Sequence, residues 1–307
     1  MHWKVKGVIQ KALSTVPGGV AVNDFLQRSL GGLQNFEANV DMKVTKDWAV
    51  FMAHLKNLNI DPRGLDFFEI GTGWYPTLPV CFSLAGAGTI RTYDLNPLLK
   101  PAWTFRMVQC LAQNLPLIAE AAQRPLAEVA AEYERLRRAS TIEELFAIAR
   151  IEYRAPADAS ASPLPDGSVD ILYSNSVLEH VYPDDIASIM RESYRLLRPG
   201  GMAIHSANCG DHYAYFDRHI TAINYLRYSS TDWEFWQNKM LYQNRLRPDD
   251  LLQIALNAGF TKRLYAFTPK SRLLELLPSM PIAPEFQRYT PEQLCSTSVD
   301  FVVQRGA

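Results

Sequence analysis

The chain has 307 residues, a formal net charge of −1 and a hydrophobic content of 48%. This length suits one large α/β domain or two small ones, and the apolar content is ample for a core. The near-zero charge gives no electrostatic basis for binding nucleic acid or an anionic membrane. No apolar run is long enough to span a bilayer, so neither nucleic acid nor stable membrane insertion is expected.

The four cysteines are scattered along the chain, with no Cys-x-x-Cys pair and no zinc-type spacing to histidines. They are Cys81, Cys110, Cys209 and Cys295. Separate thiols of this kind fit a reducing compartment, and we expect a cytoplasmic protein. Composition leaves the oligomeric state open.

Residues 1–60 predict N-terminal helices that pack on the core. A first helix ends at Pro17-Gly18-Gly19, a second helical stretch follows, and residues 43–58 have helical apolar spacing. The first helix carries lysines and apolar residues but no continuous apolar stretch, so we do not expect it to be a signal peptide. Docking on the domain is favoured over a membrane-surface helix.

The main domain is expected over residues 61–307, and its first strand ends in a glycine turn. The run Leu65-Asp66-Phe67-Phe68-Glu69-Ile70 leads directly into Gly71-Thr72-Gly73. Asp94 lies 94 − 71 = 23 positions after Gly71, at the end of a second short strand over residues 89–93. A strand, a glycine turn, a helix and a second strand ending in an acid are typical of a nucleoside site in an open α/β sheet.

The turn differs from a dinucleotide-binding turn. Pro76 occupies the position of the third glycine, and the aromatic pair Trp74-Tyr75 crowds the approach. Glu69 would repel a phosphate but suit an ammonium group. S-adenosylmethionine has a ribose and an ammonium group and no phosphate, so this pattern favours it over a dinucleotide.

Two segments exceed what a minimal sheet of this kind requires. Residues 97–149 are helix-rich, although a crossover needs only a dozen or more residues. Residues 208–247 are rich in Tyr, Trp, His and Asp. Both are predicted insertions, and we expect them to cover the carboxyl edge of the sheet and enclose a substrate.

The remaining elements alternate between strands and helices. The predicted strands lie at 169–175 and 202–207, with late strands at about 262–268 and 297–304; the predicted helices lie at about 184–197 and 248–260. This order indicates a doubly wound α/β sheet whose last strand is antiparallel.

Several motifs together resemble the class I S-adenosylmethionine-dependent methyltransferases, in particular the methyltransferase type 11 group. The motifs are Glu69-x-Gly71-x-Gly73, Asp94, Asp158-Ala159, Leu164-Pro165-Asp166-Gly167-Ser168-Val169-Asp170, Leu178-Glu179-His180-Val181 and Leu197-Arg198-Pro199-Gly200-Gly201. The resemblance covers about residues 65–207. It implies a Rossmann-like, mostly parallel seven-stranded sheet, S-adenosylmethionine as cofactor and a small-molecule methyl acceptor as partner.

The resemblance also implies roles for individual residues. Glu69, Gly71, Thr72 and Gly73 would face the methionine part of the cofactor, and Asp94 would bind the ribose hydroxyls. Leu95 would lie against the adenine, whose amino group Asp158 would accept, with Ala159 beside it. Ser174 or Asn175 would lie under the cofactor at the end of the strand 169–175.

Two histidines are candidate catalytic residues. His212 follows the predicted strand 202–207, and a hydroxyl acceptor would need a base there; Asp211 or Asp217 could orient it. His180 belongs to the family motif and is the second candidate. Glu179 and His180 are also similar to a metal-binding variant of this family, but that variant has an acid where this chain has Ser176, so no metal is expected.

The sequence therefore predicts a methyltransferase that acts on a small molecule, with oxygen as the favoured acceptor atom. A nicotinamide-dependent oxidoreductase and a non-catalytic cofactor-binding protein on the same fold are the alternatives. The aromatic residues of 208–247 could wall an acceptor pocket or form the core of a helical cover.

Overall fold

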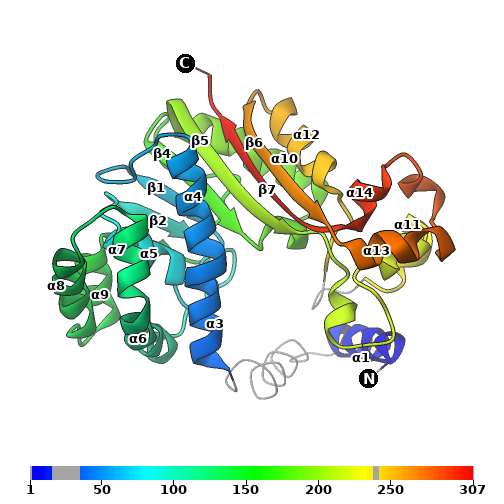
Figure 1. The fold of residues 1–307 in the computed structure, drawn as a ribbon, viewed down its shortest axis with the longest axis horizontal. Helices are drawn as coiled ribbons and strands as arrows, with labels where there is room; N and C mark the ends of the chain where they lie inside the picture. Colours follow the sequence, from blue (N-terminus) through cyan, green and yellow to red (C-terminus); the bar gives the residue numbers. More distant parts are fainter. Residues whose placement is uncertain (1, 16–34, 238–241, 307) are drawn as a thin grey trace.

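The computed structural model describes residues 2–15, 35–237 and 242–306. A single seven-stranded sheet runs through its centre in the order β3-β2-β1-β4-β5-β7-β6 (Figure 1). The strands are β1 (Phe67–Ile70), β2 (Ile90–Tyr93), β3 (Ile151–Arg154), β4 (Val169–Asn175), β5 (Leu197–Asn208), β6 (Thr261–Pro269) and β7 (Ser296–Gln304). The second helical stretch predicted near the N-terminus falls mainly on residues 16–34, outside the described ranges.

The first five strands are parallel, and β7 runs antiparallel to both of its neighbours, β5 and β6. The predicted doubly wound sheet with an antiparallel last strand is confirmed. Strand order reverses at β1, which pairs with β2 on one side and with β4 on the other. In sheets of this kind, ligands bind outside the carboxyl ends of the strands at this reversal.

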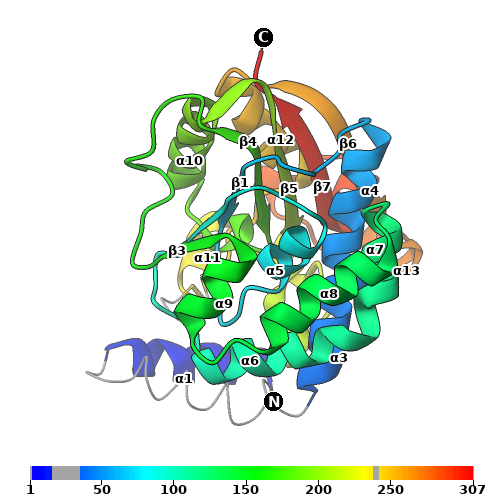
Figure 2. The same ribbon diagram turned by 90° about the vertical axis from the view of Figure 1, so that its left-hand side faces the viewer.

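Helices cover both faces of the sheet. One face carries α4 (Ala49–Asn57), α5 (Thr77–Leu84), α6 (Pro101–Cys110), α7 (Leu115–Ala121), α8 (Leu126–Arg137) and α9 (Ile142–Ala149). The other face carries α10 (Pro183–Leu196) and α12 (Pro248–Asn257). Figure 2 shows α4, α7 and α8 on the opposite side of the sheet from α10.

The alternation of side chains along β1 explains the two cores. Successive residues of a strand point to opposite faces, so Phe67 packs with α4 and α5 while Phe68 packs with α10. Both phenylalanines are completely buried. A strand covered on both faces is mostly apolar, and within Phe67–Ile70 only Glu69 is polar.

Three features differ from the expected elements. The sequence analysis did not assign β3, an edge strand with two exposed residues in its four. Strand β5 begins at Leu197 instead of Met202, because the Arg198–Gly201 segment continues the strand. Between β6 and β7 the chain forms two further helices, α13 (Ser271–Leu276) and α14 (Pro291–Cys295).

The first helix, α1 (Trp3–Thr15), packs on the segment 208–247. The Trp3 indole is 2% exposed and lies against Tyr213 and Trp236, with ring centroids 5.2 and 4.9 Å away. The Trp3 backbone N–H donates to Asp217 Oδ2 at 2.9 Å. The helices α3 (Phe36–Met42), η2 (Lys43–Trp48) and α4 instead belong to the core on one face of the sheet. In the described ranges, no helix is long and apolar enough to cross a bilayer.

Segment 208–247 lies beyond the carboxyl end of β5 (Figure 1) and is built from short turns of helix. These are η5 (His212–Tyr215), η6 (Asn224–Arg227) and α11 (Ser230–Glu234). Its aromatic residues pack on one another and on Trp3, as a core of their own: Tyr225 is completely buried and Trp233 is 4% exposed. The aromatic residues therefore act mainly as the core of a cover.

A fully buried arginine joins this cover to the C-terminal strands. Arg247 donates to the carbonyl oxygens of Cys209, at 2.9 Å, and Gln293, at 2.7 Å, as well as to the Tyr225 hydroxyl. It also donates to the carbonyls of Leu294 and Ser296. A buried guanidinium is tolerated only when its donors are satisfied, so these carbonyls fix the end of β5 beside the start of β7.

The turn after β1 lies tightly against the loop after β4. Gly71 has φ +87°, and a Cβ at this position would collide with Val177 Cγ2. Gly64, in the turn before β1, has φ +73°, but a Cβ there would meet no described heavy atom within 4 Å other than those of its chain neighbours. The two glycines thus share the left-handed backbone but differ in the space around them.

We expect Gly71→Ala to lower the free energy of unfolding by more than Gly64→Ala does. Gly64→Ala carries only the strain of a left-handed backbone, about 1–2 kcal/mol, and Gly71→Ala adds the collision with Val177. The double variant Gly71→Ala/Val177→Ala should recover the excess apart from the loss of the valine contacts. Urea denaturation measures all four proteins; equal losses in the two single variants would contradict the close contact.

Replacing Arg247 should cost more stability than replacing any exposed arginine of the cover. Arg247→Ala leaves several buried carbonyls without donors, at about 1–3 kcal/mol for each unsatisfied group. Arg227→Ala, an exposed residue of η6, is the matched control and should change stability by less than about 0.5 kcal/mol. A similar unfolding midpoint for both variants in thermal denaturation would refute this role.

Candidate functional site

A cavity of about 820 Å³ opens at the carboxyl ends of β1, β2 and β4. Its position is the strand-order reversal at which α/β sheets bind ligands. Predicted site residues that line it are Gly71, Thr72, Gly73, Asp94, Leu95, Asp158, Ala159, Asn175 and His180. One sheet edge therefore brings together nine of the twelve residues that the sequence analysis proposed.

The glycine turn and Asp94 form one hydrogen-bonded unit. The Gly73 N–H donates to Asp94 Oδ2 at 2.8 Å, and the Asn96 N–H donates to Asp94 Oδ1 at 2.9 Å. Gly71 and Gly73 have φ values of +87° and +69°, which glycine adopts without strain. The turn thus presents its backbone to the cavity, and the Asp94 carboxylate is held at the cavity wall.

The loop after β3 supplies a second carboxylate. Asp158 Oδ1 accepts the Ser160 N–H at 2.8 Å, which stabilises the loop, and Asp158, Ala159 and Ser160 all line the cavity. The Ala157 N–H donates to the Asp94 carbonyl at 2.9 Å. This contact keeps the loop next to the end of β2. Leu95, on the same side, is 67% exposed.

The N-terminal helices also line the cavity, which the sequence analysis did not foresee. Asn39, Met42 and Lys43 contribute side chains from α3 and η2. Asn175, at the end of β4, donates through Nδ2 to Asp47 Oδ2 at 2.9 Å. Because η2 carries Asp47, this bond fixes the helix over the cavity. The i, i+4 spacing of Asn39 and Lys43 is the signal that could have indicated a shared face.

The two predicted insertions contribute less to the cavity than expected. Of residues 97–149 only Leu98 lines it, and no described residue of 208–247 does. The first insertion instead packs on α5, beside the sheet. The second borders another cavity, of about 720 Å³, where Arg245 forms an ion pair with Glu285 at 3.3 Å. The expectation that both segments enclose one pocket is therefore corrected.

Glu69 and Ser174 lie behind the cavity wall. The Glu69 carboxylate accepts the Thr92 hydroxyl, whose oxygen is 2.6 Å from the Thr72 hydroxyl. Burial raises the pKa of Glu69 to about 7, although the Thr92 hydrogen bond opposes this shift. Ser174 is completely buried, and its hydroxyl is 2.8 Å from His205 Nδ1. Both side chains point into the layers that support the site.

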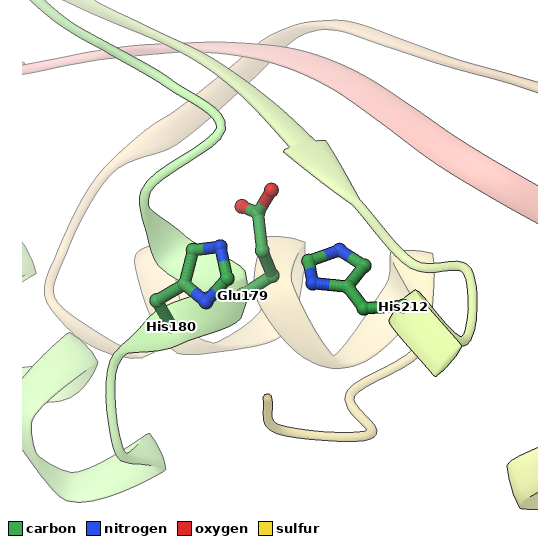
Figure 3. A group of neighbouring side chains, drawn as sticks. All are labelled: Glu179, His180 and His212. Atoms are coloured by element: carbon green, nitrogen blue, oxygen red, sulfur yellow. The ribbon is translucent and has the colours of Figure 1, made fainter. Parts of the chain in front are cut away.

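Glu179, His180 and His212 form a cluster beside the cavity (Figure 3). The first two belong to the short helix η4 (Leu178–His180), and His212 begins η5. One ligand-type atom from each residue lies within 4.8 Å of the other two. The two imidazole rings are tilted to each other with centroids 5.0 Å apart. The sequence analysis named both histidines but did not predict that they meet.

The environment of the cluster disfavours charge on its buried members. Burial raises the pKa of Glu179 to about 7, against two backbone N–H groups that lower it. Burial, and then the charge of His180, lower the pKa of His212 to about 4. The Asp211 carboxylate accepts the Tyr213 N–H, and the Asp217 carboxylate accepts the Trp3 N–H. These hydrogen bonds go to groups other than the His212 imidazole.

The family comparison places part of this chain among known methyltransferases. Residues 126–205 match the family Methyltransf_11, described as a methyltransferase domain. No curated protein sequence matches the chain significantly.

Several solved structures that the chain weakly resembles are described as methyltransferases. An S-adenosylmethionine-dependent methyltransferase from Mesorhizobium loti is 18% identical, with 82% of this chain and 96% of that chain covered and a TM-score of 0.44. A geranyl diphosphate methyltransferase in complex with S-adenosylmethionine is 14% identical, with 92% and 95% covered and a TM-score of 0.47. Sequence identities and TM-scores this low do not indicate which methyl acceptor this chain uses.

The matched segment spans α8 to β5 and includes the loop that supplies Asp158 and the helix that supplies His180. The sheet that contains it has the seven, mostly parallel strands that the resemblance implied. The predicted family and its cofactor, S-adenosylmethionine, are thereby confirmed. Over residues 126–205, the chain matches the methyltransferase domain family Methyltransf_11.

Proposed function

We propose that this protein transfers the methyl group of S-adenosylmethionine to a hydroxyl group of a small molecule. The observation that carries the proposal is the 820 Å³ cavity at the strand-order reversal, with the glycine turn, Asp94 and Asp158 on its wall. Ligand pockets usually measure about 300–1,000 Å³, so this cavity is large enough for a cofactor and a small acceptor together.

The proposed cofactor roles follow from the hydrogen-bonding capacity that each side chain has left after its contacts within the protein. Each oxygen of Asp94 accepts one backbone N–H and keeps a second lone pair for a ribose hydroxyl. Asp158 Oδ2 is the acceptor for the adenine amino group, with Leu95 and Ala159 against the ring. The turn Gly71-Thr72-Gly73 lets the methionine part approach the backbone. The Glu69 carboxylate supports this turn through the hydroxyl groups of Thr92 and Thr72. Asn175, at the end of β4, supports the cavity wall beneath the cofactor.

The transfer is an in-line displacement. A lone pair of the acceptor oxygen forms the new O–C bond, and the C–S bond breaks with its electrons going to the sulfur, which becomes a neutral thioether. The hydroxyl proton leaves to a base. His180 lines the cavity and His212 lies directly behind it, so this imidazole pair is the proposed route for the proton. The rest of catalysis is alignment of donor and acceptor.

We expect Asp94→Ala to remain folded and to bind S-adenosylmethionine about tenfold to a hundredfold more weakly. Removing the carboxylate leaves the ribose hydroxyls without an acceptor and loosens the glycine turn, at a cost of about 1–3 kcal/mol. Isothermal titration calorimetry measures the affinity, with Glu120→Ala, an exposed acid on α7, as the control. Unchanged affinity in Asp94→Ala would remove Asp94 from the site.

His212→Ala should lower kcat by about 10²–10⁴-fold, the usual contribution of a positioned proton acceptor, while the affinity for S-adenosylmethionine stays near that of the wild type. The acceptor is first identified by a screen of metabolites with a labelled methyl donor. His219→Ala, an exposed histidine in the same segment, is the control and should keep full turnover. Full turnover of His212→Ala would show that the acceptor needs no such group.

A further inference from the structure

The cluster of Glu179, His180 and His212 contains two buried polar atoms without a partner. Glu179 is 2% exposed and His212 is 7% exposed. Among the residues that the structure describes, Glu179 Oε2 and His212 Nε2 have no hydrogen-bond partner. Buried polar atoms are normally hydrogen-bonded, so each exception needs an explanation, of which a bound ion is one. Figure 3 shows the Glu179 side chain between the two imidazole rings, so the free atoms face a shared space.

The tautomer of His180 is fixed in the form that leaves a ligand atom free. His180 Nδ1 lies 2.9 Å from the carbonyl oxygen of Tyr242. A carbonyl oxygen can only accept, so Nδ1 carries the proton and Nε2 keeps its lone pair. A histidine that binds a metal almost always donates its other N–H to a carbonyl or carboxylate in this way.

One short segment, residues 242–244, contacts all three residues of the cluster. Tyr242 accepts from His180, as described above. Gln243 Oε1 accepts the His212 backbone N–H at 3.0 Å. The Asn244 backbone N–H donates to the Glu179 carbonyl at 2.8 Å, and its Nδ2 donates to the carbonyls on either side of the Glu179-His180 pair. Such outer contacts are what orients ligands in a metal site.

We propose that Glu179 Oε2, His180 Nε2 and His212 Nε2 bind one divalent transition-metal ion. Two imidazoles and one carboxylate are a ligand set of catalytic zinc sites, in which a fourth position stays open. The expectation of no metal rested on Ser176 in place of an acid; it did not include His212, which comes from a different loop. One ligand-type atom of each of the three residues lies within 4.8 Å of the other two. Zinc–ligand bonds of about 2.1 Å place tetrahedral ligands roughly 3.4 Å apart, so each side chain needs only a small rotation.

The position of the site gives the ion a role in the proposed reaction, on which this part of the inference rests. His180 lines the cofactor cavity, whereas Glu179 and His212 are buried behind it. The open position of a bound ion would therefore be reached from the cavity, on the His180 side. An acceptor hydroxyl bound there would lose its proton more readily, because a bound metal lowers the pKa of a coordinated hydroxyl or water. With both imidazoles bound to the ion, that proton would leave to water in the cavity.

The test is direct metal binding by the full chain, without cofactor or acceptor. The protein is stripped with a chelator and titrated with ZnCl₂ by calorimetry; we expect one equivalent to bind, at least about 100-fold tighter than Mg²⁺, which prefers oxygen ligands. Glu179→Gln keeps the shape of the side chain and should weaken zinc binding by about 100-fold or more. His219→Ala, the exposed histidine of the same segment, should bind as the wild type does.

His180→Ala provides the decision if Glu179→Gln does not fold, because His180 is exposed and its removal disturbs no core. It should lose zinc binding and keep its affinity for S-adenosylmethionine. Absence of a stoichiometric zinc site in the wild type, or equal zinc affinity in wild type and His180→Ala, would overturn the proposal. The proposed methyl transfer can also proceed with the imidazoles alone and no metal. Loss of the zinc site would therefore contradict only this inference, whereas failure to bind S-adenosylmethionine would contradict the proposed function.

Discussion

The buried guanidinium of Arg247 is the interaction on which the functional half of the molecule depends. It donates to the end of β5, to the η6 tyrosine and to the three carbonyls around the start of β7. A charge with no exposed surface is tolerated only in a geometry that supplies all of these acceptors at once. The backbone just before it, residues 242–244, is therefore fixed relative to β5. Since that backbone holds η4 and η5 together, the arrangement of Glu179, His180 and His212 depends on a residue that touches none of them.

Most of the sheet could be predicted because its strands are short apolar runs ended by glycine or proline turns. The runs before Gly71 and around Ile171 follow this pattern, and both are buried on two faces. Strand β3, Ile151-Glu152-Tyr153-Arg154, did not follow it, because an edge strand needs only one apolar face. The early start of β5 was hidden by Pro199 and the glycines, which normally mark a turn; here Gly201 and Arg305 complete the pairing instead.

The cofactor side of the site was predictable because its signal is local, and the rest was not. Gly71, Gly73 and Asp94 lie within 24 positions of one another in the sequence, and the turn itself brings them together. Whether the Glu69 and Ser174 side chains enter the cavity depends on which face of a strand they occupy, and both point toward supporting layers. His180 and His212 are 212 − 180 = 32 positions apart, and they meet only because residues 242–244 pair with both loops.

The dependence of the cover on Trp3 ties the two ends of the described structure together. The segment that matches the methyltransferase family ends at residue 205, inside β5, before the cover begins. The cover has its own aromatic core, and α1 contributes the Trp3 ring to it from the N-terminal end of the chain. Removal of α1 would therefore expose the rings that pack on Trp3, and an exposed apolar patch of this kind favours aggregation.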